Sequence, residues 1–185
     1  MGADRRFDVY AYGVVSSSTL YRVRGAFPGV EAYAEIEDVS YMIGGEAANS
    51  SIVLARLGAR VMLDGSWIGD DGDGRRTRSL LAGYGIDISR LSPRPGYRGV
   101  EEVVFSTGDA RTIFGTYGAL LDNEEWNSPR EDDIAAAKVV CLDPFFVGPA
   151  TRVAEIASGF GKPVITVDCR HDNPLLRHTS AVVIA

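Results

Sequence analysis

The chain has 185 residues, of which 45% are hydrophobic and 24% charged, with a formal net charge of −6. This length and composition are sufficient for one domain with a single buried core and argue against a disordered chain. The acidic balance and the lack of a long Lys or Arg run exclude a typical nucleic-acid-binding surface. No apolar stretch approaches the roughly 20 residues of a membrane-spanning helix, and the N-terminus lacks an apolar signal region. We therefore expect a cytoplasmic protein that binds neither nucleic acid nor membranes.

Short β-branched or aromatic runs alternate with segments of helical periodicity, a pattern typical of a largely parallel sheet with crossover helices. Gly58 and Gly85 follow two of the helical segments and are suited to end them. In chain order, the predicted elements are a strand at 7–15, a helix at 47–57, a strand at 60–66, helices at 75–84 and 132–137, a strand at 139–143, a helix at 150–160, and strands at 164–168 and 181–184.

Two segments, near residues 20–43 and 97–117, depart from this alternation. The second contains a short apolar β-forming run, a turn with the sequence TGDA at 107–110, and another such run. We expect β-hairpins outside the main sheet, which form either a lid or oligomer contact, or a plain extension of the sheet edge. No repeat or linker interrupts the chain, so residues 1–185 are predicted to form a single domain.

The sequence GGEAAN at residues 44–49 stands at the start of the first long predicted helix. Paired glycines allow the backbone to approach a ligand closely, and the free N–H groups of a first helical turn donate to oxygen-rich groups. Asn49 can donate and accept hydrogen bonds at once, which suits sugar hydroxyls better than a bare anion. On this motif alone, an ordinary Gly-Gly turn before a packed helix is an equally open interpretation.

Further motifs follow in a fixed order: LARLGA at 54–59, IGDDGDG at 68–74 and GID at 85–87. This ordered set resembles the N-terminal region of the ribokinase-like (PfkB) carbohydrate kinase family, from about residue 7 to the end of the chain. The resemblance implies an α/β three-layer sandwich with a mostly parallel central sheet and a small β-sheet lid, truncated at the C-terminus. The two off-pattern segments would form the lid.

The family's substrate-binding glycines and asparagine correspond by this resemblance to Gly44, Gly45 and Asn49. After the first strand the family places an Asp that holds two sugar hydroxyls, whereas this chain has Ser16 and Ser18 at the polar positions. A neutral hydroxyl makes a hydrogen bond roughly half as strong as a carboxylate does. The identity of the sugar is therefore left open.

Later strand ends supply three more candidate substrate contacts by the same resemblance. Asp143 ends one predicted strand, and Asp168 and Arg170 follow the next. The carboxyl ends of strands are where open α/β sheets bind ligands. Each candidate has a structural alternative, such as a turn cap for Asp143 and an ion pair with Asp172 for Arg170.

Family members continue past the strand that corresponds to residues 181–185 into an Asn-x-x-Glu motif and a Gly-Ala-Gly-Asp segment, which supply metal organisation, an anion hole and the general base. This sequence contains neither. Phosphoryl transfer depends on positioning and charge stabilisation by such groups. We therefore assign no catalytic and no metal-binding residue to this chain. ATP and Mg²⁺ are expected for a full-length family member, and neither is expected to bind this chain strongly.

Three interpretations stay open at this point. The chain is the substrate-binding half of a sugar or nucleoside kinase that is inactive alone, or a non-catalytic sugar-binding or self-associating module, or an incomplete fold. Which sugar or nucleoside is recognised depends on lid side chains such as Arg98, Glu101 and Phe105, whose directions the sequence does not give. A half-covered sheet and exposed lid strands also predict a homodimer, formed through the lid or through the uncovered sheet.

Overall fold

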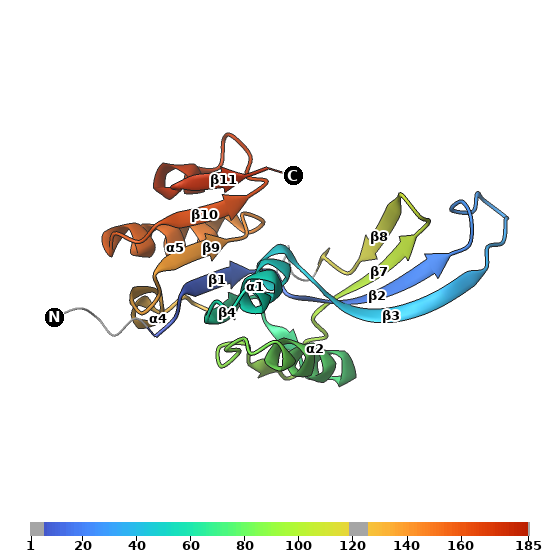
Figure 1. Ribbon diagram of the computed structural model, residues 1–185, viewed down its shortest axis with the longest axis horizontal. Helices are drawn as coiled ribbons and strands as arrows, with labels where there is room; N and C mark the ends of the chain where they lie inside the picture. The colour runs from blue at the N-terminus through green and yellow to red at the C-terminus, as the bar shows by residue number, and fades with distance from the viewer. Residues whose placement is uncertain (1–5, 119–125, 185) are drawn as a thin grey trace.

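A parallel five-stranded sheet forms the body of the protein (Figure 1). In the computed structural model, which describes residues 6–118 and 126–184, its strand order is β11-β10-β9-β1-β4. β1 is central, since Val9 pairs with Val61 on one side and with Val139 on the other. The strands are β1 (Val9–Gly13), β4 (Val61–Gly65), β9 (Val139–Leu142), β10 (Val164–Val167) and β11 (Ala181–Val183). All five correspond to the strands predicted from the β-branched runs.

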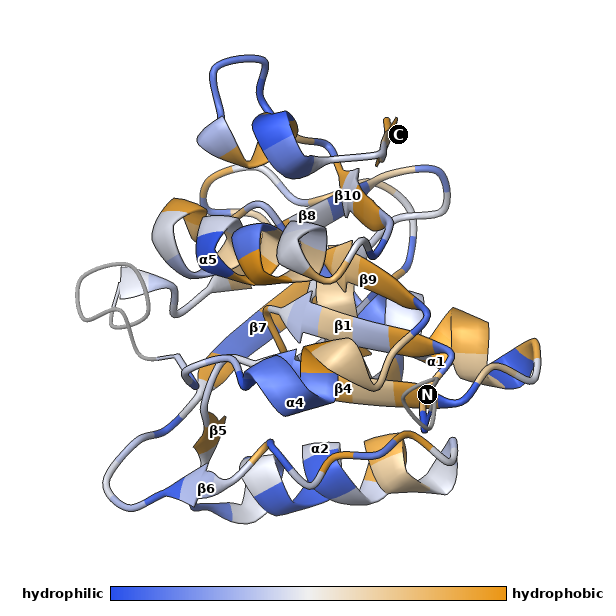
Figure 2. Ribbon diagram, turned by 90° about the vertical axis from the view of Figure 1, so that its left-hand side faces the viewer, coloured by the Kyte–Doolittle hydropathy of each residue, from blue (hydrophilic) through white to orange (hydrophobic). Residues whose placement is uncertain are grey.

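Helices cover both faces of this sheet, which gives the predicted three-layer arrangement (Figure 2). Successive β1 residues point to opposite faces, so Ala11 packs with Ala48 of one helix layer while Tyr10 packs with Val153 of the other. The helices are α1 (Glu46–Arg56), α2 (Gly72–Gly83), α4 (Glu131–Ala135) and α5 (Val147–Gly159), with a short 3₁₀ helix η1 (Pro174–His178). None of the described helices combines the length and apolar character needed to cross a membrane.

The ends of α1 and α2 follow from local chemistry. α1 begins directly after Gly45 and ends before Gly58, whose N–H donates to Ala55 O at 2.9 Å. The predicted start of α2 at residue 75 is three residues late. The Asp71 carboxylate accepts a hydrogen bond from the Gly74 N–H at 2.8 Å and so caps the helix at an earlier point.

A second sheet extends from the body and is called the lid sheet below (Figure 1). Its strand order is β3-β2-β7-β8, in which two antiparallel hairpins are joined by parallel pairing of β2 with β7. The strands are β2 (Ser16–Val23), β3 (Ile36–Gly44), β7 (Val100–Ser106) and β8 (Arg111–Gly115), and a separate two-stranded ribbon pairs β5 (Ile68–Gly69) with β6 (Pro93–Arg94). The off-pattern segments thus form hairpins outside the main sheet, as predicted.

One face of the body sheet is open beyond α1. A groove of about 510 Å³ lies between α1 and strands β9, β10 and β11, with Val53, Cys141, Ile165 and Val183 among its lining residues. Figure 1 shows this face of β10 and β11 turned toward the viewer. The groove is the uncovered part of the sheet that the sequence analysis expects.

Candidate functional site

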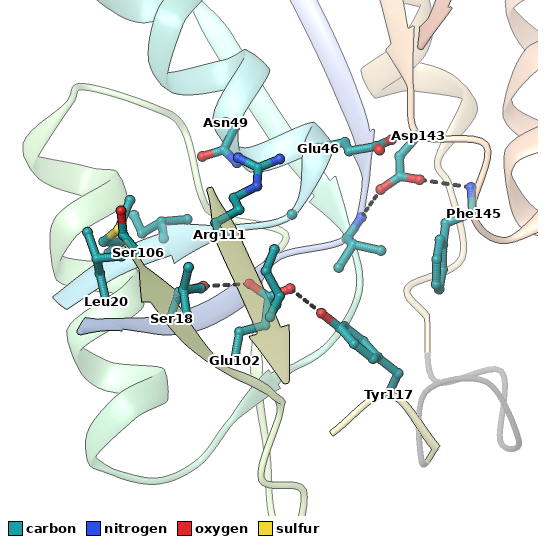
Figure 3. A pocket seen from close by; sticks show the side chains of 17 residues that line it. Ser18, Leu20, Glu46, Asn49, Glu102, Ser106, Arg111, Tyr117, Asp143 and Phe145 are labelled. Atoms are coloured by element: carbon teal, nitrogen blue, oxygen red, sulfur yellow. Dashed lines mark hydrogen bonds between the residues drawn. The ribbon is translucent and has the colours of Figure 1, made fainter. Parts of the chain in front are cut away.

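A cavity of about 630 Å³ lies between the lid sheet and the carboxyl ends of β1 and β9 (Figure 3). The body lines it with Glu46 and Asn49 of α1 and with Asp143 after β9. The lid sheet and the segment after it contribute Ser18, Glu102, Ser106, Arg111 and Tyr117. Open α/β sheets bind ligands at this end of their strands, so the cavity is the candidate site.

Gly44 and Gly45 form the turn that joins the lid sheet to α1, and both line the cavity. Gly45 has a φ of 90°, and a Cβ there would overlap the carbonyl of Val14. A Cβ on Gly44 would overlap the side-chain oxygens of Ser16, Ser18 and Glu102. The two glycines were predicted to let the backbone approach a ligand. They line the cavity, and they also leave room for the protein's own groups: the Val14 carbonyl beside Gly45 and the side-chain oxygens beside Gly44.

Asn49 lies one turn into α1, and its backbone N–H donates to Gly45 O at 2.9 Å. Its side chain lines the cavity and is labelled in Figure 3. The structure thus brings Gly44, Gly45 and Asn49 to one wall, and the amide of Asn49 is available there to donate and accept hydrogen bonds.

Asp143 is buried at the end of β9 and accepts two backbone hydrogen bonds. Its Oδ2 accepts from the Val14 N–H at 3.0 Å, and its Oδ1 accepts from the Phe145 N–H at 2.8 Å. Burial raises the pKa of this carboxyl, while the two hydrogen bonds oppose that shift. Asp143 therefore caps the turn before α5, fixes the junction of β1 and β2, and also faces the cavity.

Glu102 of β7 is the centre of a hydrogen-bond network that the sequence analysis does not identify. Ser16 Oγ and Ser18 Oγ donate to its Oε2 at 2.8 and 2.5 Å, and Tyr117 Oη donates to its Oε1 at 2.7 Å. Ser18, Glu102 and Tyr117 line the cavity, whereas Ser16 is buried behind Glu102. Burial and the bond to Glu102 raise the pKa of Tyr117, which keeps this phenol protonated as a donor. The two serines thus support a carboxylate of the neighbouring strand.

Glu46 is the first residue of α1 and lies among acidic groups. Desolvation raises its pKa from 4.5 to about 7, and the charges of Asp143 and Asp168 add to the shift. Near neutral pH the Glu46 carboxyl is therefore protonated in a substantial fraction of molecules, so that it can donate as well as accept at the edge of the cavity.

Asp168 and Arg170 do not line the cavity. Asp168 has a φ of 41° in the turn after β10, where its N–H donates to Val183 O at 2.8 Å. Arg170 is exposed and pairs with Asp172 at 3.0 Å, which is the structural alternative considered from the sequence. Arg170 is thus not brought to the site, whereas Asp168 lies close enough to Glu46 for its charge to act on that carboxyl at the edge of the cavity.

None of these three lid residues lines the cavity: Glu101 and Phe105 lie on the other face of β7, and Arg98 precedes the strand. Arg98 pairs with Glu101 at 3.1 Å, and Phe105 packs against other aromatic rings. Their neighbours on β7, Glu102 and Val104, line the cavity instead. Because side chains alternate along a strand, a shift of one residue exchanges the two faces.

The sequence of the chain matches a known protein family over most of its length. The model of the pfkB family carbohydrate kinases matches residues 11–157, which is more than half of the chain. The chain belongs to the pfkB carbohydrate kinase family. No curated protein matches the sequence.

Solved structures share the pfkB-family fold found here. An Agrobacterium tumefaciens protein assigned as a ribokinase has a TM-score of 0.82 and 25% identity, and the match covers 96% of this chain and 59% of that one. Arabidopsis thaliana ribokinase, solved with ribose and ATP, has a TM-score of 0.78 and 17% identity, with 96% and 60% covered. A nucleoside kinase of Methanocaldococcus jannaschii has a TM-score of 0.74 and 20% identity, with 95% and 60% covered. The chain thus spans about 60% of the length of these relatives.

The pfkB family implies ATP and Mg²⁺, whose binding requires metal ligands and donors for the phosphate groups. Within residues 6–118 and 126–184, no three His, Cys, Asp or Glu side chains are grouped so that they could hold a metal ion. The Asn-x-x-Glu and Gly-Ala-Gly-Asp motifs are not in the sequence. The described residues therefore do not fit the nucleotide and its metal, and no step through either group is assigned to them.

Proposed function

We propose that this chain is the sugar- or nucleoside-binding part of an ATP-dependent carbohydrate kinase, which phosphorylates a sugar hydroxyl in its full-length form. The cavity between the lid sheet and the body carries this proposal, because Gly44, Gly45, Asn49 and Asp143 meet there. Phosphoryl transfer is not proposed for this chain alone, since the residues needed to stabilise the moving phosphoryl group are not in it.

The chemistry of the cavity supports a polyhydroxylated ligand. Asn49 and the protonated fraction of Glu46 can each donate and accept, while Asp143 and Glu102 accept. Apolar groups such as Ile43, Val104 and Ile113 also line the cavity and can pack against the C–H face of a sugar ring. The lid sheet lines one side of the cavity, and a ligand held between it and the body would exchange water for protein contacts there.

Binding of a sugar without nucleotide tests this proposal. Thermal shift and calorimetric titration of the 185-residue chain would use ribose, fructose, glucose and adenosine, each with and without Mg²⁺-ATP. We expect one ligand class to raise the melting temperature in the absence of nucleotide. Asn49→Ala is expected to weaken that binding by about tenfold, because two hydrogen-bonding groups are lost.

Arg170→Ala is the matched control, because Arg170 is a sequence candidate that the structure places outside the cavity. It should bind the same ligand as the unmodified chain does. Failure of every sugar and nucleoside to bind would overturn the proposal. An equal loss of ligand affinity in Asn49→Ala and Arg170→Ala would mean that the ligand binds outside this cavity.

We also propose that the chain forms a homodimer, for which the lid offers a specific surface. Tyr21, Phe27 and Phe114 surround Phe105 with ring centroids 5.4 to 6.0 Å away, on the face opposite the cavity. Phe27 and Phe114 are exposed, and exposed apolar patches of this kind mark interaction surfaces. The open groove over β9–β11 is the other candidate surface for self-association.

The substitution Phe114→Asp distinguishes a dimer formed through the aromatic surface of the lid from one formed through the groove over β9–β11. Light scattering should give a dimer mass for the unmodified chain and a monomer mass for this variant. Ile113→Asp is the control. Ile113 directly precedes Phe114 in β8 and is similarly exposed, but its side chain faces the cavity. A monomer mass for the unmodified chain would overturn the proposal, and a dimer mass for Phe114→Asp would move the contact to the groove.

A further inference from the structure

The floor of the cavity below Gly44 is formed by the Glu102 carboxylate and by hydroxyl groups that donate to it, of which those of Ser18 and Tyr117 are seen in Figure 3. Ser16, Ser18 and Tyr117 donate to Glu102 over 2.5 to 2.8 Å. A hydroxyl has one proton, so each of these groups has none left to donate to a ligand. A carboxylate has about four lone-pair positions, of which three are filled here, and one remains for a ligand.

The position of Glu102 follows from the pairing of β2 with β7. Ser18 lies opposite Glu102 in the parallel register, and Ser16 lies two residues earlier on the same face. β7 thus brings a carboxylate into the cavity beside the two serines of β2, whose hydrogen bonds hold it in one orientation.

From this geometry we infer that the floor accepts hydrogen bonds and does not donate them, so that the chain selects neutral or amino sugars over sugar acids. The inference rests on the proposed function. A sugar hydroxyl or an ammonium group can donate to Glu102 and to the lone pairs of Ser18 and Tyr117. A sugar carboxylate at the same place would meet a fixed negative charge and no donor, and such an unpaired contact strongly disfavours binding.

Among the described residues that line the cavity, Arg111 is the cation, and its position is consistent with the inference. It pairs with Ser106 at the far end of β7, four residues from Glu102, which is about 13 Å of backbone. In Figure 3 its guanidinium points toward the Asn49 side of the cavity and away from Glu102. The cation therefore does not change the acceptor character of the floor.

The test compares ligands that differ in charge on the same carbon skeleton. Calorimetric titration would use glucosamine, glucose and glucuronate as one series, and ribose and ribonate as another. We expect the neutral and amino sugars of the series that binds to have at least tenfold higher affinity than its acid. An acid that binds as tightly as the neutral sugar would overturn the inference without involving any variant.

Glu102→Gln is the decisive variant because it keeps the shape and removes the charge. It should weaken binding of the neutral sugar by about tenfold and reduce the discrimination against the acid, while Glu102→Asp retains that discrimination. Glu101→Gln is the matched control, since it changes the same charge on the adjacent residue, which faces away and pairs with Arg98. Circular dichroism of each variant confirms folding, and the comparison within the unmodified chain stands if one variant does not fold.

The outcomes separate the inference from the proposed function. Sugar binding that Glu102→Gln and Glu101→Gln affect equally would overturn the inference and leave the proposed function intact. No binding of any sugar in either series to the unmodified chain would overturn both.

Discussion

The body sheet and the lid sheet are both built of extended strands, but the side chains of the body are buried and those of the lid are largely exposed. Every residue of β1 and β4 is buried, whereas every residue of β8 is exposed. Helices pack on both faces of the central body strands, while the lid has the cavity on one face and exposed aromatic rings on the other. The body is therefore held by packing, and the lid by cross-strand pairing and a few polar contacts. We therefore expect substitutions in the body to lower mainly the stability of the fold, and substitutions in the lid to weaken mainly ligand binding.

The largest difference should come from truncating one apolar side chain in each sheet. Leu63 of β4 is fully buried, whereas Ile113 of β8 is 44% exposed. Leu63→Ala should lower the free energy of unfolding by about 2–5 kcal/mol, because it leaves a cavity in the core. Ile113→Ala should change it by about 0.5 kcal/mol or less. Urea unfolding of both variants checks this, and equal losses would contradict the division between the two sheets.

Asp143→Ala tests the junction between the two regions. The substitution leaves the N–H groups of Val14 and Phe145 without their carboxylate partner, and the first of these is buried. We expect a loss of about 1–3 kcal/mol in the free energy of unfolding together with weaker sugar binding. Asp143→Asn keeps an acceptor and should lose less. Unchanged stability of Asp143→Ala would mean that water replaces the carboxylate and that the junction does not depend on it.

The body was predictable from the sequence because its signals are local. Runs such as residues 139–142 are apolar enough to identify a buried strand, and glycines bound α1 to within one residue of the prediction. GGEAAN at residues 44–49 was found for the same reason, since a turn and the helix after it are encoded by adjacent residues. Two predicted helix starts are three residues late: α2 begins at Gly72, where the Asp71 carboxylate caps it, and α5 begins at Val147, ahead of the predicted Ala150.

The lid was predictable as hairpins but not in the direction of its side chains. Glu101 and Glu102 are adjacent, and only the pairing of β2 with β7 determines which of them faces the cavity. Tyr117 joins the network through a contact 15 residues away in sequence. Contacts of this kind depend on strand register, which the hydrophobic pattern specifies weakly in an exposed sheet. The placement of Arg170 outside the cavity has a similar cause, because a turn after a strand can lead toward the site or away from it.

Gly44→Ala should affect the site more than the fold. Its methyl group would displace Glu102 and the two serine hydroxyls, so we expect about tenfold weaker sugar binding, equivalent to about 1.4 kcal/mol. Gly29→Ala is the control, because Gly29 lies in the connection between β2 and β3 with open space around its Cα. Titration of both variants with the same sugar gives the comparison. Equal affinities would show that the network below Gly44 rearranges without consequence for the ligand.

The smallest expected effect is a dependence on pH from Glu46, which lies where the body meets the cavity. Its folded-state pKa is raised from 4.5 to about 7, so the unfolded state releases this proton first as the pH rises. The stabilising contribution of the protonated carboxyl is therefore complete below about pH 4.5 and is lost as the pH passes 7. The positive end of the α1 dipole favours the charged form, but burial and the neighbouring carboxylates dominate the shift.

Glu46→Gln removes this titration. Its melting temperature should equal that of the unmodified chain near pH 4.5 and exceed it at pH 8 by about 1–2 °C, as expected for a change of about 0.5 kcal/mol in a chain of this size. Glu131→Gln is the control, because Glu131 is also the first residue of a helix but lies outside the cavity and 3.9 Å from the guanidinium of Arg152. Its difference from the unmodified chain should not grow between these pH values. A constant difference for Glu46→Gln would contradict the raised pKa of Glu46, and with it both the desolvation of this carboxyl and the effect of Asp143 and Asp168 on it.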